Sequence, residues 1–478
     1  MLTLPAPART TTTKAAKTAP RTTRRTAPRT APALLAAVFF ALYTAYALRE
    51  HARFRTTGYD LGIFGQAVRA YAEGRAPASE IRTATAPPGF TADAFPLLGD
   101  HFHPVLAVLA PFYRLAPHVE TLLVAQAGLV ALSVYVIART AQRQLPELRF
   151  APMAVGTAAG LCWGVQQLVG FDFHEVAFAV PLLALACRAH LDDRPRAAAC
   201  WAGALLLVKE DLGATAFVFG LLLVHRNRRH RRNRQVGLAL CAFAAVGSVV
   251  IVCAVLPALA PDGRYGYLDQ AASPYGVLDG WPVKSETLVA LLAATGGLVL
   301  RSPLALLLLP TLAWRFTSSN PAYWGPGLHY SAVLAPVALA ALIDALRRGA
   351  RLPLAVPLAV ALVMLPAQPL SDLARPGFWQ EDSREAAARA ALRLVPDGAP
   401  VAASNSLVPH LTDRTRAHLV ADGVLERRPE LEWIVADRTD PFPWGAVDAV
   451  VRRAEELGWR RVREESGIIV LTRAPASP

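Results

Sequence analysis

The charged residues of this 478-residue chain are sorted by position between long apolar runs. Clusters of arginine fill every second gap, and the other gaps hold most of the Asp, Glu and His found outside the C-terminal region. The arginine gaps are Arg139–Arg149, Arg188–Arg196, Arg226–Arg234, Arg301 and Arg347–Arg351. Short cytoplasmic loops of membrane proteins are enriched in Lys and Arg. The alternation therefore indicates a multi-pass protein of the cell membrane, with its reactive side chains on the outer face.

Composition agrees with a membrane protein. The chain is 54% hydrophobic and 18% charged, which is too apolar for a soluble protein of this size. The net charge of +13 is concentrated in the N-terminal tail and the short arginine loops. There it orients the protein and meets anionic membrane lipids, so we expect no nucleic-acid partner. The cysteines form no CxxC pair, and their pattern indicates neither a disulfide framework nor a zinc site.

Residues 1–30 are rich in Thr, Ala, Pro and Arg and contain no acid. Such a segment cannot bury a core, so we expect a disordered basic cytoplasmic tail. A signal or transit peptide is the competing interpretation. The following apolar run is long for a signal sequence and has no clear small-residue cleavage site before Arg49, so we interpret it as the first span.

About 20 apolar residues are needed to cross the hydrocarbon core. The expected spans are 31–48, 119–138, 151–169, 176–191, 197–208, 212–225, 236–257, 286–300, 302–315, 329–346 and 352–370. That makes about 11 transmembrane helices within a domain of residues 31–370, and an odd count places the C-terminus outside. Two short helices meeting at Lys209–Asp211 keep the Arg226–Arg234 gap inside, whereas one continuous helix would put it outside. The pair around Arg301 is similarly short.

Residues 371–478 are charged and resemble a soluble domain. Helical pieces at 387–394 and 446–457 alternate with extended pieces at 401–404, 433–436 and 468–471. This alternation predicts a small extracytoplasmic α/β domain on an otherwise all-α membrane protein.

The first outer loop, residues 49–118, is too long for a simple linker. Tyr59–Phe64 opens an amphipathic helix, with Ile63, Ala67, Ala70 and Tyr71 expected on one side. Asp60 stands at its beginning, where a helix N-terminus favours a carboxylate. An N-cap role and a role in chemistry both remain open for Asp60.

His101 and His103 flank a phenylalanine in the same loop. In extended chain a spacing of two puts both imidazoles on one side, where they could bind a metal or a phosphate. Two solvated loop histidines are the alternative.

Two further groups of ionisable residues border apolar runs. Asp172, His174 and Glu175 follow one run, and Lys209, Glu210 and Asp211 interrupt another. Ionisable groups inside a membrane are costly unless paired or liganded. They predict either a substrate-binding acidic pocket, in which Lys209 binds a lipid-linked phosphate, or a structural knot of ion pairs.

His329 and Tyr330 begin a later apolar run. They are a second candidate for donor binding. An interfacial anchor and a member of the aromatic belt are the alternatives.

The order YDLGIFGQ, HFHP, FDFHE, LLLVKED, HYSAVLAP and SNSLVPHLTDR resembles an uncharacterised family of bacterial polytopic membrane proteins. That family is related to the GT-C clan, whose multispan glycosyltransferases use polyprenyl-phosphate sugars. The resemblance extends from about residue 40 to 440 and implies a GT-C-like fold. In the clan an acidic residue soon after the first span is the catalytic base or a metal ligand, and Asp60 matches that position.

The resemblance implies transfer of a sugar from a polyprenyl-phosphate donor to an acceptor at the outer face of the membrane, with Asp60 activating the acceptor. The acidic pair of the clan's metal-dependent members is not evident near Asp60. A divalent metal therefore remains an open question, with His101, His103, Asp172 and Glu175 as candidate ligands. A secondary transporter with a midplane ion relay and a non-catalytic cell-envelope protein are the alternative functions.

Overall fold

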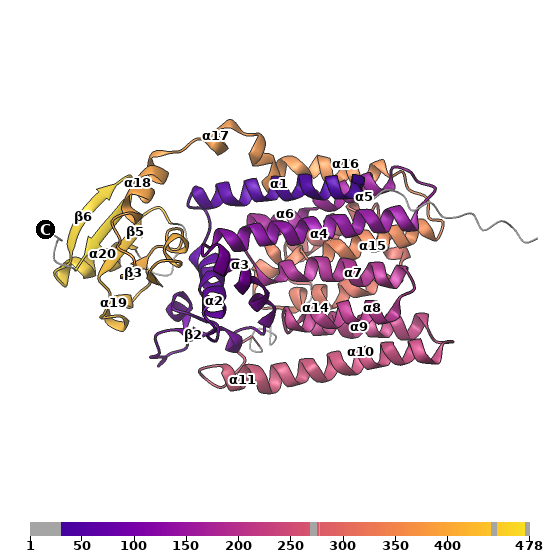
Figure 1. Ribbon diagram of the computed structural model, residues 1–478, viewed down its shortest axis with the longest axis horizontal. Coiled ribbons are helices and arrows are strands. Elements are labelled where there is room, and N and C mark those ends of the chain that lie inside the picture. The colour runs from indigo at the N-terminus through magenta and orange to yellow at the C-terminus, as the bar shows by residue number, and fades with distance from the viewer. Residues whose placement is uncertain (1–29, 268–274, 277, 441–446, 474–478) are drawn as a thin grey trace, which may run out of the picture.

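The computed structural model describes residues 30–267, 275, 276, 278–440 and 447–473. It contains a helical bundle with a small sheet at one end (Figure 1). The expected basic tail lies outside the described residues except for Thr30, the first residue of helix α1.

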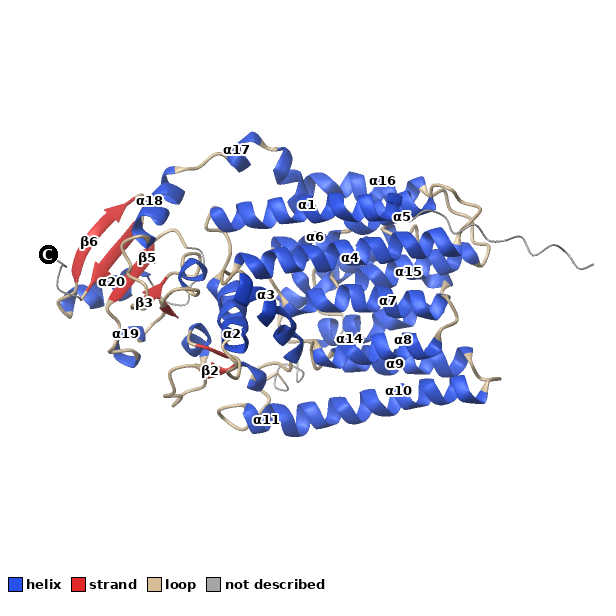
Figure 2. Cartoon of the chain, in the orientation of Figure 1, coloured by secondary structure: helices blue, strands red, loops and turns tan. Residues whose placement is uncertain are grey.

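Helices of the bundle run side by side (Figure 2). They are α1 (Thr30–Ala52), α4 (Glu120–Gln144), α5 (Ala151–Gly160), α6 (Trp163–Gly170), α7 (Ala179–Leu191), α8 (Pro195–Gly203), α9 (Leu212–Arg226), α10 (Arg231–Val250), α11 (Leu256–Leu259), α13 (Trp281–Ala293), α14 (Leu309–Thr317), α15 (Leu334–Arg347) and α16 (Ala355–Met364). Helix α15 is apolar on all sides and is buried from Leu334 to Ala345, as expected for a helix in the centre of a bundle. Helix α10 lies along one edge (Figure 1).

The protein is a membrane protein with several spanning helices. Four described segments are long and apolar enough to cross a bilayer: Thr30–Ala52, Glu120–Gln144, Arg231–Leu259 and His329–Arg347. The other expected spans coincide with shorter or broken helices. The count of about 11 crossings therefore stays a prediction.

Polar contacts show where the short helices turn back. Arg226 Nη2 at the end of α9 lies 2.6 Å from Asp193 Oδ1, just before α8. Between these two residues the chain therefore travels along the bundle and returns. Helices α8 and α9 form the expected short pair, with Lys209–Asp211 in the turn that joins them.

The gap at Arg301 lies at the same end of the bundle as Arg226. Ser302 Oγ donates a hydrogen bond of 2.8 Å to Asp344 Oδ2, and Asp344 pairs with the arginines that end α15. His190 of α7 interacts electrostatically with both Arg226 and Asp344. We call this end, where the arginine gaps meet, the arginine end.

Smaller elements lie between the bundle and the sheet (Figure 1). They are α2 (Ile63–Ala72), α3 (Ala110–Leu115) and the antiparallel pair β1 (Ala78–Ser79) and β2 (Phe95–Pro96). Ile63, Ala67 and Ala70 are buried as expected, whereas Tyr71 is partly exposed. Phe64 and Val68 are buried as well, and Arg69 on the polar side is partly exposed, so α2 is amphipathic as expected.

The C-terminal sheet has the strand order β4-β3-β5-β7-β6. Strand β3 pairs in parallel with β4 and β5, and β7 is antiparallel to both β5 and β6. We call residues 383–473 the C-terminal unit. Its elements are α18 (Ser383–Leu392), β3 (Pro400–Ala403), β4 (Arg416–Leu419), α19 (Val424–Arg427), β5 (Trp433–Asp437), α20 (Val447–Glu456), β6 (Arg460–Glu465) and β7 (Ile468–Thr472), and the short α17 (Pro376–Trp379) precedes it.

Sequence patterns predict β3, β5 and β7 and helices α18 and α20, but not β4 or β6. Strand β6 reads RRVREE and shows no apolar alternation, because it is an exposed edge strand and charge protects such an edge from further pairing. Along β3, Val401 and Ala403 belong to the core of the bundle, while Ala402 belongs to a separate cluster on the other face of the sheet. One face of the sheet therefore shares an apolar core with the membrane helices, and this core continues through the smaller elements that lie between them.

A cysteine-accessibility experiment tests the orientation that the arginine gaps predict. In a background without the native cysteines, Arg229→Cys at the arginine end should be shielded from an impermeant maleimide in intact cells. Asp397→Cys, on the C-terminal unit, should be labelled. Both should react after the membrane is permeabilised. Labelling of the Arg229→Cys variant from outside would reverse the orientation.

Candidate functional site

Polar side chains from several parts of the chain converge where the bundle meets α2, opposite the arginine end. We call this group the polar cluster. It consists of Asp60, His101, His103, Asp172, His174, Glu175, Lys209, Glu210, Asp211 and His329.

Glu175 lies at the centre of the polar cluster and is 1% exposed. Its Oε1 is 3.1 Å from Lys209 Nζ, and its Oε2 is 2.7 Å from His174 Nδ1. A buried carboxylate is costly unless it is paired. The turn between α8 and α9 places Lys209 beside Glu175, which follows α6, and so provides the partner that this carboxylate needs.

Glu210 binds the loop that carries the HFHP motif. Its Oε1 lies 2.6 Å from His101 Nδ1 and accepts a hydrogen bond of 2.7 Å from the Tyr265 hydroxyl. Its Oε2 accepts a hydrogen bond of 2.9 Å from the backbone of Phe102. These contacts are those of the expected ion-pair knot, and they fix the loop over the bundle.

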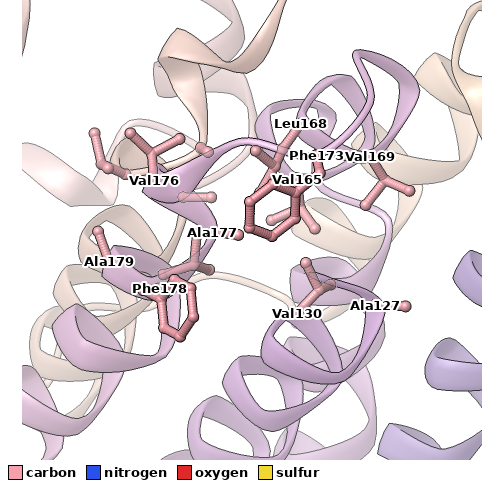
Figure 3. Close-up of a cluster of buried hydrophobic side chains, with 14 of the residues drawn as sticks. Ala127, Val130, Val165, Leu168, Val169, Phe173, Val176, Ala177, Phe178 and Ala179 are labelled. Atoms are coloured by element: carbon pink, nitrogen blue, oxygen red, sulfur yellow. The ribbon is translucent and has the colours of Figure 1, made fainter. Parts of the chain in front are cut away.

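Phe173 anchors the FDFHE segment in the apolar core of the bundle. Its ring is fully buried and points into the apolar core with Val130, Val165 and Leu168 (Figure 3). Close packing of this kind leaves the adjacent polar side chains to face the end of the bundle.

Asp172 holds the chain that leads into α2. Its Oδ2 accepts hydrogen bonds from the Thr57 backbone at 2.7 Å and from the Thr57 hydroxyl at 2.8 Å. Its φ of 97° is in the left-handed region, which is strained for a residue with a side chain. Gln126 of α4 holds this backbone by donating to the Asp172 carbonyl and accepting from the His174 N–H.

Asp60 lies in a short π-helical turn, Gly58–Gly62, directly before α2. The predicted N-cap role is wrong, because Thr57 and Gly62 occupy the cap positions and Asp60 forms no hydrogen bond or ion pair among the described residues. Burial, reinforced by the Glu175 carboxylate and opposed by Lys209, raises the pKa of Asp60 to about 7. A carboxyl group of this kind exchanges its proton near neutral pH.

Hydrogen bonds from the C-terminal unit hold the turn that carries Asp60. The Gly58 N–H donates to the Asn405 carbonyl at 2.7 Å, and the Tyr59 N–H donates to Asn405 Oδ1 at 2.9 Å. A Cβ at Gly58 would lie only 2.0 Å from Val408 Cγ1, so only glycine permits this approach. Sequence reasoning did not select Asn405, although it lies in the SNSLVPHLTDR motif.

The histidines are buried rather than solvated. The ring of His329 is 4% exposed and stacks on His174 at 3.6 Å between centroids, so its interpretation as an interfacial anchor is wrong. His103 packs against Phe64 at 5.8 Å, and its buried Nδ1 has no partner among the described atoms. Burial lowers the pKa of His103 to about 4, so its ring is neutral at pH 7.

Asp211 lies at the margin of the polar cluster, and Tyr330 borders it. Tyr330 is partly exposed, and its ring lies 4.7 Å from that of Tyr323. Asp211 interacts electrostatically with Lys209, and its buried Oδ1 has no hydrogen-bond partner within the described chain. Tyr330 also contacts the cluster, because its ring lies 4.1 Å from that of His329.

The candidate metal ligands do not form a metal site. Among the described residues, no three His, Cys, Asp or Glu side chains gather closely enough to hold an ion. Asp172 is committed to Thr57, and Glu175 to Lys209 and His174. The donor set does not fit a resident divalent metal.

Two tyrosines after α11 were missed because sequence reasoning followed only strongly ionisable residues. Tyr265 binds Glu210, and the Tyr267 ring lies 4.3 Å from that of His101. Tyrosines with both an apolar ring and a hydroxyl often line binding sites. The GRYGYLD segment carried that signal.

A family model described as predicted membrane protein (DUF2079) matches residues 50–470. The chain belongs to this family. The matched range includes every member of the polar cluster and most of the C-terminal unit. No curated protein sequence matches the chain.

Two crystal structures of ArnT from Cupriavidus metallidurans are similar in fold. The structure bound to undecaprenyl phosphate aligns with a TM-score of 0.56 at 13% identity, covering 93% of this chain and 98% of that one. The apo structure aligns with a TM-score of 0.52 at 13% identity, covering 92% and 97%. ArnT is a GT-C glycosyltransferase, so this DUF2079 protein has a membrane glycosyltransferase-like fold.

Charge pairing at Glu175 can be tested by stability. Glu175→Gln should lower the free energy of unfolding by about 3–5 kcal/mol, because Lys209 loses its buried partner. The measurement is a thermal or denaturant melt in detergent. Glu455→Gln, which removes a surface pair with Arg461, is the matched control and should cost less than about 1 kcal/mol.

The double variant Glu175→Gln/Lys209→Met should be more stable than Glu175→Gln alone, because it leaves no unpaired charge. A Glu175→Gln variant as stable as the control would contradict the pairing.

Proposed function

We propose that the protein transfers a sugar from a polyprenyl-phosphate carrier to an acceptor hydroxyl at the outer face of the membrane, with Asp60 as general base. The observation that carries the proposal is the position of Asp60. It is a carboxyl group with a pKa near neutrality, it is partly exposed, and it lies within electrostatic range of a half-buried cation, Lys209. General-base catalysis requires a group of this pKa within reach of the acceptor.

The reaction needs two opposite charges. The acceptor oxygen forms a bond to the anomeric carbon and gives its proton to Asp60, while the bond from that carbon to the phosphate oxygen breaks. The polyprenyl phosphate leaves with the electron pair. Negative charge grows on the phosphate as the sugar becomes oxocarbenium-like, so a fixed cation beside it lowers the barrier.

Lys209 is the residue best suited to hold the phosphate. An ammonium group has three N–H donors, and Glu175 accepts from one side only. Tyr265, Tyr267 and His101 lie beside it and can surround a sugar ring with aromatic faces. The same end of the bundle is reached by apolar helices that would accommodate a prenyl chain. The structure of ArnT with undecaprenyl phosphate supports a lipid carrier of this class.

The proposed topology places this chemistry outside the cell. With eleven crossings and a cytoplasmic N-terminus, the arginine end faces the cytoplasm, and the polar cluster and the C-terminal unit face outward. Lipid-linked sugars would then meet Asp60 at the level of the outer head groups.

The transporter alternative has less support. A relay of ions needs ionisable groups near the middle of the membrane, whereas Lys209 and Glu210 lie in a turn at the end of their helices under a covering loop. A non-catalytic envelope protein remains the rival that activity measurements have to exclude.

Asp60→Asn is the direct test of the general base. The fold should survive, with stability changed by less than about 1 kcal/mol, since Asp60 forms no contact that Asn would break. Transfer of labelled sugar from a polyprenyl-phosphate donor should fall at least about a hundredfold. Asp448→Asn, on the surface of the C-terminal unit, is the matched control and should retain activity. Undiminished transfer by Asp60→Asn would show that another group is the base.

The pH dependence gives a second test of Asp60. The base must be ionised, so kcat/KM should fall as the pH drops through about 7, the pKa of Asp60. A carboxyl group with its usual pKa would keep the rate constant down to about pH 4. A profile that is flat between pH 5 and about 8 would exclude Asp60 with the raised pKa from this role.

A further inference from the structure

A large cavity lies apart from the polar cluster, between α1, α3 and α4 on one side and the C-terminal unit on the other. Its volume of about 1290 Å³ exceeds the range of roughly 300–1,000 Å³ usual for small-molecule pockets. Neither Asp60 nor Lys209 lines it. The cavity is therefore distinct from the proposed donor site at Lys209, and its size suits a ligand as large as a lipid.

The floor of the cavity is apolar and open. Val108, Phe112 and Leu115 line it from α3 and the turn before that helix, and these side chains are 56%, 58% and 86% exposed. The apolar segment Pro104–Leu115 is too short to cross a bilayer. Exposed apolar side chains next to membrane helices are typical of a segment in contact with lipid chains.

The opposite wall is cationic. Arg389, Arg393 and Arg414 line the cavity from the C-terminal unit, together with the carboxylate of Glu120. Outside the lining, Glu381 pairs with Arg389 at 3.2 Å and Asp397 with Arg414 at 2.9 Å. Arg393 is exposed and forms no ion pair within the described chain. Arg414 is held in place by the carbonyls of Leu392 and Val395. A guanidinium group presents its N–H donors in a planar fork that matches the oxygens of a phosphate.

A short chain of contacts joins the cavity to the polar cluster. His51 lines the cavity, stacks on His410 at 3.9 Å and bonds Thr56 Oγ1 at 2.8 Å. The next residue, Thr57, is the one that Asp172 holds. Glu385 of α18 pairs with Arg49 and Arg53 at the end of α1, at 3.4 and 2.9 Å. A ligand here would therefore contact both the membrane helices and the C-terminal unit.

We propose that this cavity binds an anionic phospholipid of the membrane, with its chains on the apolar floor and its phosphate at Arg389 and Arg393. The lipid joins the C-terminal unit to the bundle beside the turn that carries Asp60. Charge complementarity selects an anionic head group, and the apolar floor selects a lipid over a soluble phosphate.

The test is lipid retention by the delipidated full-length protein, measured by native mass spectrometry and by the shift in melting temperature. Phosphatidylglycerol should bind and raise the melting temperature, whereas phosphatidylcholine of the same chain length and soluble glycerol phosphate should not. The double variant Arg389→Gln/Arg393→Gln should bind phosphatidylglycerol at least about tenfold more weakly, since each basic side chain at a lipid surface contributes roughly fivefold.

Control variants separate this site from general surface charge. Arg427→Gln/Arg452→Gln removes two exposed arginines elsewhere on the C-terminal unit and should bind as the parent does. Gly128→Leu adds apolar bulk to the lining, at a position where a Cβ meets only Phe40 at 3.8 Å, and should also weaken binding. If the double variant fails to fold, Arg393→Gln alone removes a side chain without an ion pair and gives the same test.

Equal binding of the two phospholipids would overturn the proposal. Unchanged binding of phosphatidylglycerol by both Arg389→Gln/Arg393→Gln and Arg393→Gln would overturn it as well. Preferential retention of polyprenyl phosphate that these variants abolish would also overturn it, since the cavity would then be the donor site. Binding of phosphatidylglycerol does not depend on sugar transfer. A protein that binds the lipid as expected but transfers no sugar would refute the proposed function and leave this inference intact.

Discussion

The arrangement of the site depends on the pairing of Glu175 with Lys209 at 3.1 Å. A carboxylate that is nearly inaccessible to solvent has to meet a cation, and the chain supplies that cation by interrupting an apolar run and folding it into two short helices. Once the turn is fixed in this way, Glu210 is positioned to hold the loop of His101, and Glu175 in turn adds to the field that Asp60 experiences.

Much of the membrane part could be predicted from the sequence, because the physics of insertion acts on single segments. Apolar runs and arginine gaps predict the helices and the turn at Lys209 without reference to distant residues. Strand β6 could not be predicted, since an edge strand of charged residues has no periodic signal of its own, and β4 was missed because its four residues, RAHL, are too few to show one. His329 was misinterpreted because its burial depends on His174, more than one hundred residues away.

The site itself was predictable as a set of residues but not as a geometry. The motifs name the ionisable side chains, and the structure brings most of them together. The neutral residues that position them were missed. Thr57 carries no charge, and Asn405 lies in a different part of the fold. Their function depends on backbone N–H groups, which every residue except proline carries and which therefore leave no trace in composition.

The hydrogen bond between Tyr59 and Asn405 has a consequence for biosynthesis. These residues are 346 positions apart in the chain, and ribosomes add about 5–20 residues per second. Roughly 20–70 s of synthesis therefore separate the appearance of Asp60 from the appearance of the segment that orients it. During that interval the membrane helices can insert and pack while the proposed base stays unpositioned, so the site is complete only when the C-terminal unit has been synthesised and has folded.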